Sequence, residues 1–282
     1  MPKLPNFFLA GAPKAGTTSL YHYLDQHPQI YMSPIKEPNF FASEIRPENF
    51  DSQLQRRAAD DAVQVQEYLA GPMRKKRFGG IVTQWDDYVR LFANATSETA
   101  LGEASVCYLW SPSAPSKIAE RIPAAKIIVM LRDPAAREFS EYVQCLGSGA
   151  IQGTFREYIN NCLDHRTPPF CIHYPSLDLG FYAAQLRRYL DRFGPNVWIG
   201  FYEDFCAQPL DIYGDICRFL GVTPHFVPDM RQKHLKATGP TRALAIDPAD
   251  RRLLIDLYRD DIAQLAALLN RNLDHWLRYN PS

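Results

Sequence analysis

Residues 7 to 20 combine a short apolar run, a glycine-containing break and the start of a helical pattern. Residues 7–10 are apolar, as expected for a buried strand, and Gly11 ends the run. Hydroxyl residues at 17 to 19 then open a stretch with helical spacing. A strand, a glycine loop and a helix N-terminus direct free backbone N–H groups and the positive end of the helix dipole at one point. We therefore expect a phosphate-binding loop formed by Lys14, Ala15, Gly16, Thr17, Thr18 and Ser19.

The spacing of this loop differs from that of the nucleotide triphosphatases, which is G-x-x-x-x-G-K-[ST]. Gly11 and Gly16 have the right separation, but Thr17 stands where the lysine belongs, and Lys14 supplies the positive charge instead. The loop is thus predicted to hold a phosphate without requiring a metal-bound triphosphate. The alternative at this point is a strand–turn–helix junction that carries a lysine by chance.

A second segment has the pattern of a strand that leads into a capped helix. Residues 127–131 are continuously apolar, which is typical of a strand buried on both faces of a parallel sheet. Asp133 is expected as the helix N-cap, with Pro134 at the first helical position. Arg132 then lies at the carboxyl end of the strand, where open α/β sheets bind ligands, and Ser140 follows about two helical turns later. Arg132 and Ser140 are candidates to bind a second phosphate.

Strands and helices alternate along the rest of the chain, which predicts an α/β fold with a central parallel sheet flanked by helices. Further strands are expected at residues 30–32 and 197–201. Helices are expected at residues 52–70, 211–220 and 248–269.

Three segments, in this order along the chain, resemble motifs of the sulfotransferase family. Residues 13–20 (PKAGTTSL) resemble its 5′-phosphosulfate loop. Residues 36–41 (KEPNFF) resemble a block that holds the proposed catalytic glutamate of the heparan-type branch. Residues 131–140 resemble the motif for the 3′-phosphate, and residues 180–190 and 219–222 extend the similarity over nearly the whole chain.

The resemblance implies transfer of a sulfuryl group from 3′-phosphoadenosine 5′-phosphosulfate to an acceptor hydroxyl or amine, in a P-loop-like fold related to nucleotide kinases. Lys14 would neutralise charge on the leaving oxygen, and Glu37 would take the proton of the acceptor. The steroid-type branch of the family uses a histidine base, so a histidine is the alternative for this step. No metal is expected.

The resemblance also assigns residues to the donor and acceptor sides. Arg132 and Ser140 would grip the 3′-phosphate, and Lys236 and Thr238 would close over the nucleotide. Apart from the resemblance, Glu103 is a candidate substrate-binding residue, and a partner of Lys14 or a member of a structural ion pair are the alternatives left open. Two departures stand beside these assignments. Ala104 occupies a position that is lysine in heparan-type enzymes, and residues 234–242 differ from the Lys-Gly-Arg-like nucleotide loop of that branch.

Composition sets the remaining expectations. The 282 residues contain no glycine- or serine-rich linker and no repeat, so one domain over 1–282 is predicted. Equal numbers of acidic and basic residues, 31 each, give no attraction to nucleic acid or to a membrane surface. No apolar run of about 18 residues predicts a membrane span. A cleavable signal peptide would remove the phosphate loop, which favours a cytoplasmic protein.

Six cysteines show no zinc-type spacing and indicate reduced thiols, with a bridge between Cys162 and Cys171 as the less favoured alternative.

Two other classes of protein remain as alternatives. The first is a metal-dependent kinase, which needs a lysine directly before Thr17 and a strand-end aspartate for magnesium. The lysine is absent, and Arg132 holds the strand end. The second is a non-catalytic nucleotide-binding protein. Against it argues the joint presence of Lys14, Glu37, Arg132 and Ser140. The acceptor, a small molecule or a glycan, and the oligomeric state are left open by the sequence.

Overall fold

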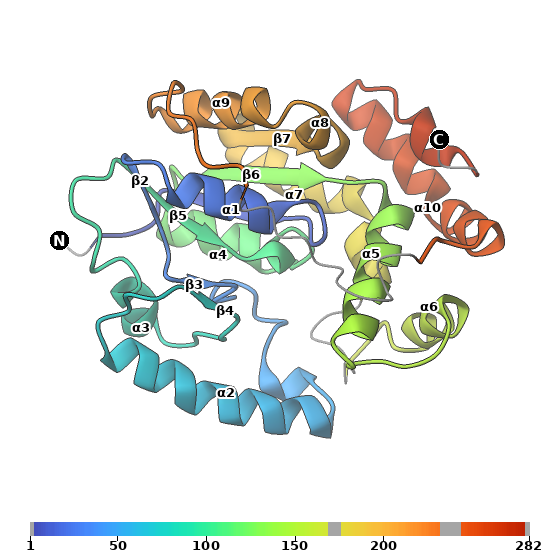
Figure 1. Ribbon diagram of the computed structural model, residues 1–282, viewed down its shortest axis with the longest axis horizontal. Helices are drawn as coiled ribbons and strands as arrows, with labels where there is room; N and C mark the ends of the chain where they lie inside the picture. The colour runs from blue at the N-terminus through green and yellow to red at the C-terminus, as the bar shows by residue number, and fades with distance from the viewer. Residues whose placement is uncertain (1–2, 169–175, 232–243, 280–282) are drawn as a thin grey trace.

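A sheet of five parallel strands forms the centre of the computed structural model, which describes residues 3–168, 176–231 and 244–279. The order of its strands is β2–β5–β1–β6–β7 (Figure 1). All neighbouring pairs in this sheet run parallel, which confirms the predicted α/β class. The strands are β1 Phe7–Gly11, β2 Ile30–Met32, β5 Ala100–Ala104, β6 Lys126–Leu131 and β7 Val197–Phe201.

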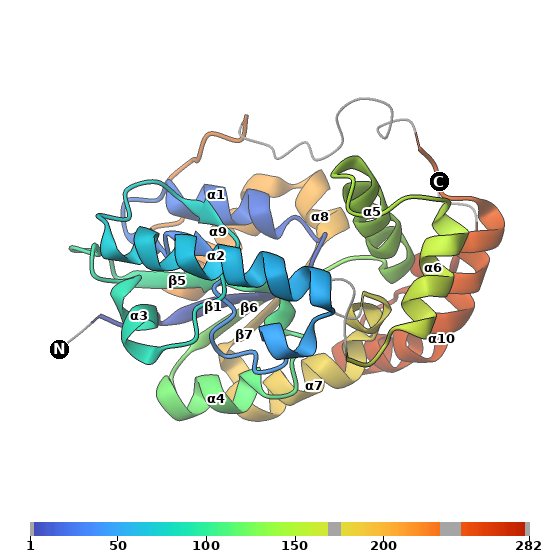
Figure 2. The same ribbon diagram turned by 90° about the horizontal axis from the view of Figure 1, so that it is seen from below.

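Helices cover both faces of the sheet (Figure 2). Helices α1, α8 and α9 lie on one face and α4 and α7 on the other, while α10 packs against α5 and α7. None of the helices in the described ranges is long and apolar enough to cross a membrane. The helices are α1 Thr17–Asp25, α2 Ser52–Ala70, α3 Trp85–Arg90, α4 Ala114–Arg121, α5 Pro134–Gly147, α6 Phe155–Asp164, α7 Tyr182–Phe193, α8 Tyr202–Ala207, α9 Pro209–Leu220 and α10 Pro248–Leu269.

Local sequence signals explain why these segments adopt these structures. Residues 127–131 of β6 are completely buried, as expected for a strand with helices on both faces. The Asp133 carboxylate accepts hydrogen bonds from the backbone N–H groups of Ala135 (2.9 Å) and Ala136 (3.2 Å), and Pro134 is the first residue of α5. The predicted cap is therefore confirmed. Helices α2 and α10 have the bounds predicted from their apolar spacing.

The fold brings the candidate residues to one edge of the sheet. In the central sheet, β5 lies on one side of β1 and β6 lies on the other. Where the strand order changes direction in this way, a crevice forms at the carboxyl ends of the strands. Helix α1 follows β1 and α5 follows β6 at this edge. A small parallel sheet of β3 (Ile35–Lys36) and β4 (Arg77–Phe78) lies between the central sheet and α2 (Figure 1).

Candidate active site

The loop between β1 and α1 has the geometry of an anion-binding turn. Gly16 has a φ of 78°, and a Cβ at this position would lie 3.1 Å from the Tyr202 ring, so both backbone and space require glycine. The N-cap residue of α1 is Gly16, which has no side chain to cap the helix, so the backbone N–H groups of the first turn can meet a ligand. Thr17 and Thr18 begin the helix here and are buried. These features fit a bound phosphate or sulfate.

Arg132 joins this loop to the end of β6. Its Nη1 donates a hydrogen bond to the Lys14 carbonyl oxygen at 2.9 Å, and its guanidinium lies 4.5 Å from the centre of the Tyr202 ring. Both contacts fix the side chain beside the loop, as expected for a group that meets an anion. Ser140 lies further along α5 and is half-buried.

Lys14 is buried and directed toward α5. Its Nζ donates a hydrogen bond to Gln144 Oε1 at 2.5 Å, and its backbone has a φ of 65°. A left-handed backbone is unfavourable for a residue with a Cβ and tends to occur where a functional geometry demands it. Gln144 was not a candidate in the sequence, because only the packing of α5 against the loop reveals the contact.

Glu37 is held in place from three sides. One carboxylate oxygen forms an ion pair with Lys36, and the other accepts a hydrogen bond from the Val106 backbone N–H at 2.9 Å. Its own N–H donates to the Ala104 carbonyl oxygen at 2.8 Å. Its φ is 68°, so Glu37, like Lys14, is one of five non-glycine residues with a positive φ in the described chain. The carboxylate is thus oriented by the fold rather than free on the surface.

A cavity of about 1060 Å³ brings Lys14, Thr17, Thr18 and Glu37 together. It opens between the phosphate loop, β3, α2 and the cavity-facing part of α5. Arg132, Ser140, Ala15, Gly16, Ser19 and Glu103 do not line it. The two proposed catalytic residues therefore share a space with room for a small molecule, while the 3′-phosphate candidates lie outside that space.

Glu103 does not line this cavity and is fully buried in β5. Its carboxylate accepts hydrogen bonds from Ser105 Oγ at 2.6 Å and from the Tyr88 hydroxyl at 3.3 Å. Burial raises the pKa of Glu103 from 4.5 to about 7, against the opposing effect of the hydrogen bonds from Ser105 and Tyr108. These contacts belong to the interior beside the Glu37 loop, and a contact with substrate remains untested.

The raised pKa of Glu103 predicts a pH-dependent stability. The folded state binds the proton more tightly than the unfolded state, so this contribution is present below about pH 4.5 and is lost as pH rises through about 7. The free energy of unfolding should therefore fall by on the order of 3 kcal/mol across this pH range because of Glu103. Glu103→Gln should remove the contribution of Glu103 to the pH dependence of stability. The contribution of Asp261, whose pKa burial raises to about 6, should remain. Free energies of unfolding in denaturant at pH 5 and pH 8 measure it, and parallel slopes for both proteins would contradict the assignment.

The histidines considered as an alternative base make contacts within the folded protein. His27 is buried and lies 3.0 Å from the Thr223 carbonyl oxygen, and His22 packs against the Phe78 ring. Neither histidine lines the cavity. Within the described residues, no cluster of three His, Cys, Asp or Glu side chains could hold a metal ion. Lys236, Thr238 and Cys171 lie outside the described residues, so their predicted roles stay untested.

Comparison with known proteins identifies the family. The family model described as the sulfotransferase family matches residues 5–226. The chain belongs to this family. A crystal structure of a sulfotransferase from Alicyclobacillus acidocaldarius is 34% identical, covers 98% of this chain and 100% of that chain, and superposes with a TM-score of 0.80. The predicted P-loop-like sulfotransferase fold is thereby confirmed.

Curated relatives are more distant and longer. The bifunctional heparan sulfate N-deacetylase/N-sulfotransferase 4 of Mus musculus is 28% identical, and the match covers 98% of this chain and 31% of the relative. Carbohydrate sulfotransferase 15 of Homo sapiens is 26% identical, covering 97% of this chain and 54% of the relative. The chain therefore spans about a third to a half of the curated relatives it matches.

Proposed function

We propose that the protein transfers a sulfuryl group from 3′-phosphoadenosine 5′-phosphosulfate to a hydroxyl or amine of an acceptor. The observation that carries this proposal is the shared cavity of Lys14 and Glu37, next to a loop suited to an anion, in a chain of the sulfotransferase family. The names of the curated relatives mention heparan sulfate and carbohydrate, so a glycan or a smaller alcohol is the acceptor class to consider.

The reaction needs one proton acceptor and one stabiliser of negative charge. Glu37 removes the proton of the acceptor hydroxyl while the oxygen of that hydroxyl forms a bond to sulfur. The bond between sulfur and the bridging oxygen of the phosphosulfate breaks, and 3′-phosphoadenosine 5′-phosphate leaves. Lys14, assisted by the N–H groups at the start of α1, stabilises the charge that grows on that oxygen. Positioning and electrostatics thus account for the chemistry, as in the related phosphoryl transfer.

The donor side of the site uses other residues. Arg132 and Ser140 are proposed to bind the 3′-phosphate, since a charged fork and a hydroxyl suit a phosphate that must be desolvated. Lys236 and Thr238 remain proposed contacts to the nucleotide. A metal-dependent kinase would need a metal ion for transfer, and a non-catalytic protein would transfer nothing. Nucleotide binding and sulfate transfer, measured without metal, therefore distinguish these alternatives from the proposed function.

Binding of 3′-phosphoadenosine 5′-phosphate, measured by calorimetry, tests this function. We expect binding without added metal, together with transfer of labelled sulfate from the donor in excess chelator. Abolition of transfer by the chelator would support a metal-dependent kinase-like enzyme. Absence of nucleotide binding would contradict the proposal and favour a protein that has kept only the fold.

Arg132→Ala should weaken the affinity for 3′-phosphoadenosine 5′-phosphate by at least about tenfold for each hydrogen bond lost, because bonds to charged groups contribute about 1.5–3 kcal/mol. Adenosine 5′-phosphate lacks the 3′-phosphate, so its affinity should change little. Arg132→Lys keeps the charge without the planar fork and serves as the matched control. Calorimetric titration of both nucleotides measures the effect. Equal weakening of both would mean that Arg132 acts through its bond to the Lys14 carbonyl.

A further inference from the structure

The cavity beside Glu37 has a largely apolar wall. Helix α2 contributes Ala58, Ala62 and Val65, which recur at helical spacing along one face. This helix runs along the outer side of β3 and β4 (Figure 1). Further apolar lining includes Ile45, Pro47, Phe50, Phe78, Ile81 and Val106. An acceptor bound here would bury apolar surface against α2, which is the usual source of affinity for small molecules.

Charge in the cavity is balanced among the described lining residues. The basic side chains are Lys14, Lys36 and Arg57, and the acidic ones are Glu37, Asp61 and Glu141. Lys36 forms an ion pair with Glu37, so its charge is largely used within the protein. Asp61 is likewise ion-paired, with Arg77, which does not line the cavity. The described lining therefore offers a polyanionic acceptor no excess of positive charge, and an anionic group placed beside Glu141 would meet a like charge. Such like-charge contacts select against anionic substrates.

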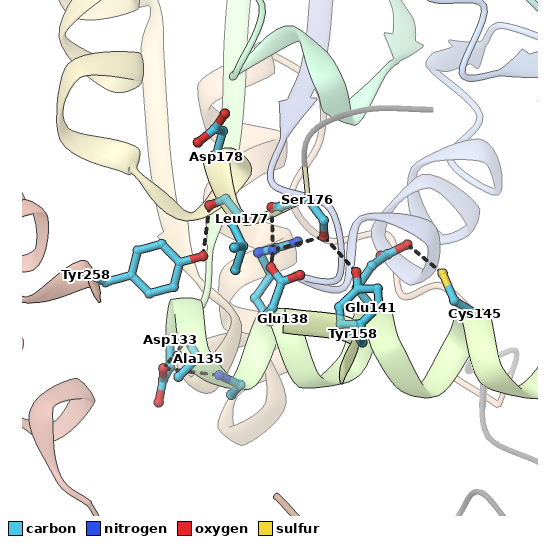
Figure 3. A network of polar contacts seen from close by, with 12 residues as sticks. Asp133, Ala135, Glu138, Glu141, Cys145, Tyr158, Ser176, Leu177, Asp178 and Tyr258 are labelled. Atoms are coloured by element: carbon cyan, nitrogen blue, oxygen red, sulfur yellow. Dashed lines mark hydrogen bonds and ion pairs between the residues drawn. The ribbon is translucent and has the colours of Figure 1, made fainter. Parts of the chain in front are cut away.

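Glu141 is the unusual member of this set. It lies on α5, is only 5% exposed and lines the cavity. Its Oε1 accepts a weak hydrogen bond from the Cys145 thiol at 3.6 Å, a contact drawn in Figure 3. Its Oε2 has no hydrogen-bond partner among the described residues. This oxygen is closed to solvent in the observed rotamer, and a buried carboxylate oxygen without a partner is costly. Rotation of the side chain toward a donor group on a ligand in the cavity would remove that cost.

We propose that the acceptor is a compact, mainly apolar molecule without anionic groups, and that a second hydrogen-bond donor on it pairs with Glu141. This inference rests on the proposed sulfuryl transfer and specifies its substrate class. One hydroxyl of the acceptor meets Glu37, the apolar body packs against α2, and the second donor, a hydroxyl or an ammonium group, meets Glu141. Glu141 is a specificity-determining residue in this arrangement, whereas the proton of the reacting hydroxyl goes to Glu37.

Four phenols with one scaffold test the acceptor class. The parent compound, 4-ethylphenol, has no second polar group, 4-(2-hydroxyethyl)phenol adds a hydroxyl, tyramine adds an ammonium, and 3-(4-hydroxyphenyl)propionate adds a carboxylate. Affinities are measured by calorimetry with the enzyme saturated with 3′-phosphoadenosine 5′-phosphate, and kcat/KM with labelled donor. We expect the hydroxyl or the ammonium compound to exceed the parent phenol by about tenfold, and the carboxylate compound to be the poorest. The better of the two identifies the donor.

Variants of Glu141 test its role. Glu141→Leu and the isosteric Glu141→Gln should reduce the preference for the second donor, most strongly for the ammonium compound. The kcat/KM for the parent phenol, which has no second donor, should fall less than that for the compounds with a second donor, so the ratio of the two values is the readout. An affinity for 3′-phosphoadenosine 5′-phosphate equal to that of the wild type shows that each variant is folded. An undiminished preference in both variants would overturn the assignment of Glu141.

A pair of neighbouring positions on α2 tests the apolar wall. Both side chains are exposed, but Ala62 lines the cavity and Val63 does not. Ala62→Asp should raise the KM for the phenols about tenfold or more, and Val63→Asp should leave it nearly unchanged. The inference about the acceptor would be overturned if N-sulfated heparan polysaccharide were sulfated in preference to the uncharged phenols, or if the uncharged phenols failed to bind. In either case, nucleotide binding and sulfuryl transfer would still support the proposed function. Loss of nucleotide binding in the wild type would instead refute the function itself.

Discussion

Glu37→Gln is expected to lower the turnover number by about 10²–10⁴-fold, the usual contribution of a general base. The amide has the same shape and can still accept the hydrogen bond from the Val106 N–H, but it cannot take a proton. Donor binding should persist, because the change is nearly isosteric. Turnover at saturating donor, together with calorimetric affinity for 3′-phosphoadenosine 5′-phosphate, measures the two effects separately.

A second carboxylate that lines the cavity, Glu141, gives the comparison. Glu141→Gln carries the same substitution on α5, and it should alter acceptor preference without abolishing sulfation of the parent phenol. If Glu37→Gln retains near-normal turnover while Glu141→Gln is inactive, the roles of the two carboxylates are exchanged. If a histidine variant alone is inactive, the base belongs to the histidine type of the family.

The sequence predicted those features that depend on neighbouring residues. The β6 run, the Asp133 cap and the Pro134 position are local signals, and the structure confirms all three. The same holds for α2 and α10, whose apolar residues recur with the period of a helix. The phosphate loop was also visible, because its function depends on a continuous stretch of backbone.

Features that depend on packing between distant segments could not be predicted. The Lys14 contact with Gln144 joins residues 130 positions apart, and the Arg132 contact with the Lys14 carbonyl spans 118. Glu141 follows the predicted Ser140 directly, yet only the orientation of α5 turns it into the cavity. Spacing along a helix gives a face, whereas the partner of that face is set by the whole fold.

The neighbourhood of Glu103 and Ala104 shows the same limit. A lysine expected from the heparan-type pattern is replaced by Ala104, which suggested a missing positive charge. In the structure, the carbonyl of Ala104 binds the Glu37 N–H, and Lys36 of β3 brings a cation to the Glu37 carboxylate. The charge beside Glu37 thus comes from a different strand, which no motif comparison at position 104 reveals.

Lys14→Ala is expected to reduce turnover by about 10²–10³-fold, the typical loss when one donor to a developing oxyanion is removed. The ammonium group should matter most as charge grows on the leaving oxygen, so its effect belongs to the transition state rather than to donor binding. Affinity for 3′-phosphoadenosine 5′-phosphate should fall less than turnover. Single-turnover rates at saturating donor measure the chemical step, and calorimetry measures binding.

The backbone of Lys14 decides which variants are informative. Its φ of 65° is unfavourable for alanine as for lysine, so Lys14→Ala removes the ammonium without changing the backbone preference. Lys14→Gly would relax that constraint as well and would mix two effects. Lys75→Ala, at an exposed position that does not line the cavity, is the matched control and should keep wild-type rates.

Gln144→Ala separates the position of the ammonium group from its charge. This variant removes the acceptor of the 2.5 Å hydrogen bond that holds Lys14 Nζ toward α5, while the charge itself remains. A purely electrostatic role for Lys14 therefore predicts a smaller loss of turnover for Gln144→Ala than for Lys14→Ala. Near-normal turnover of Lys14→Ala would remove this residue from the mechanism and leave the charge of the leaving oxygen to the N–H groups of the loop.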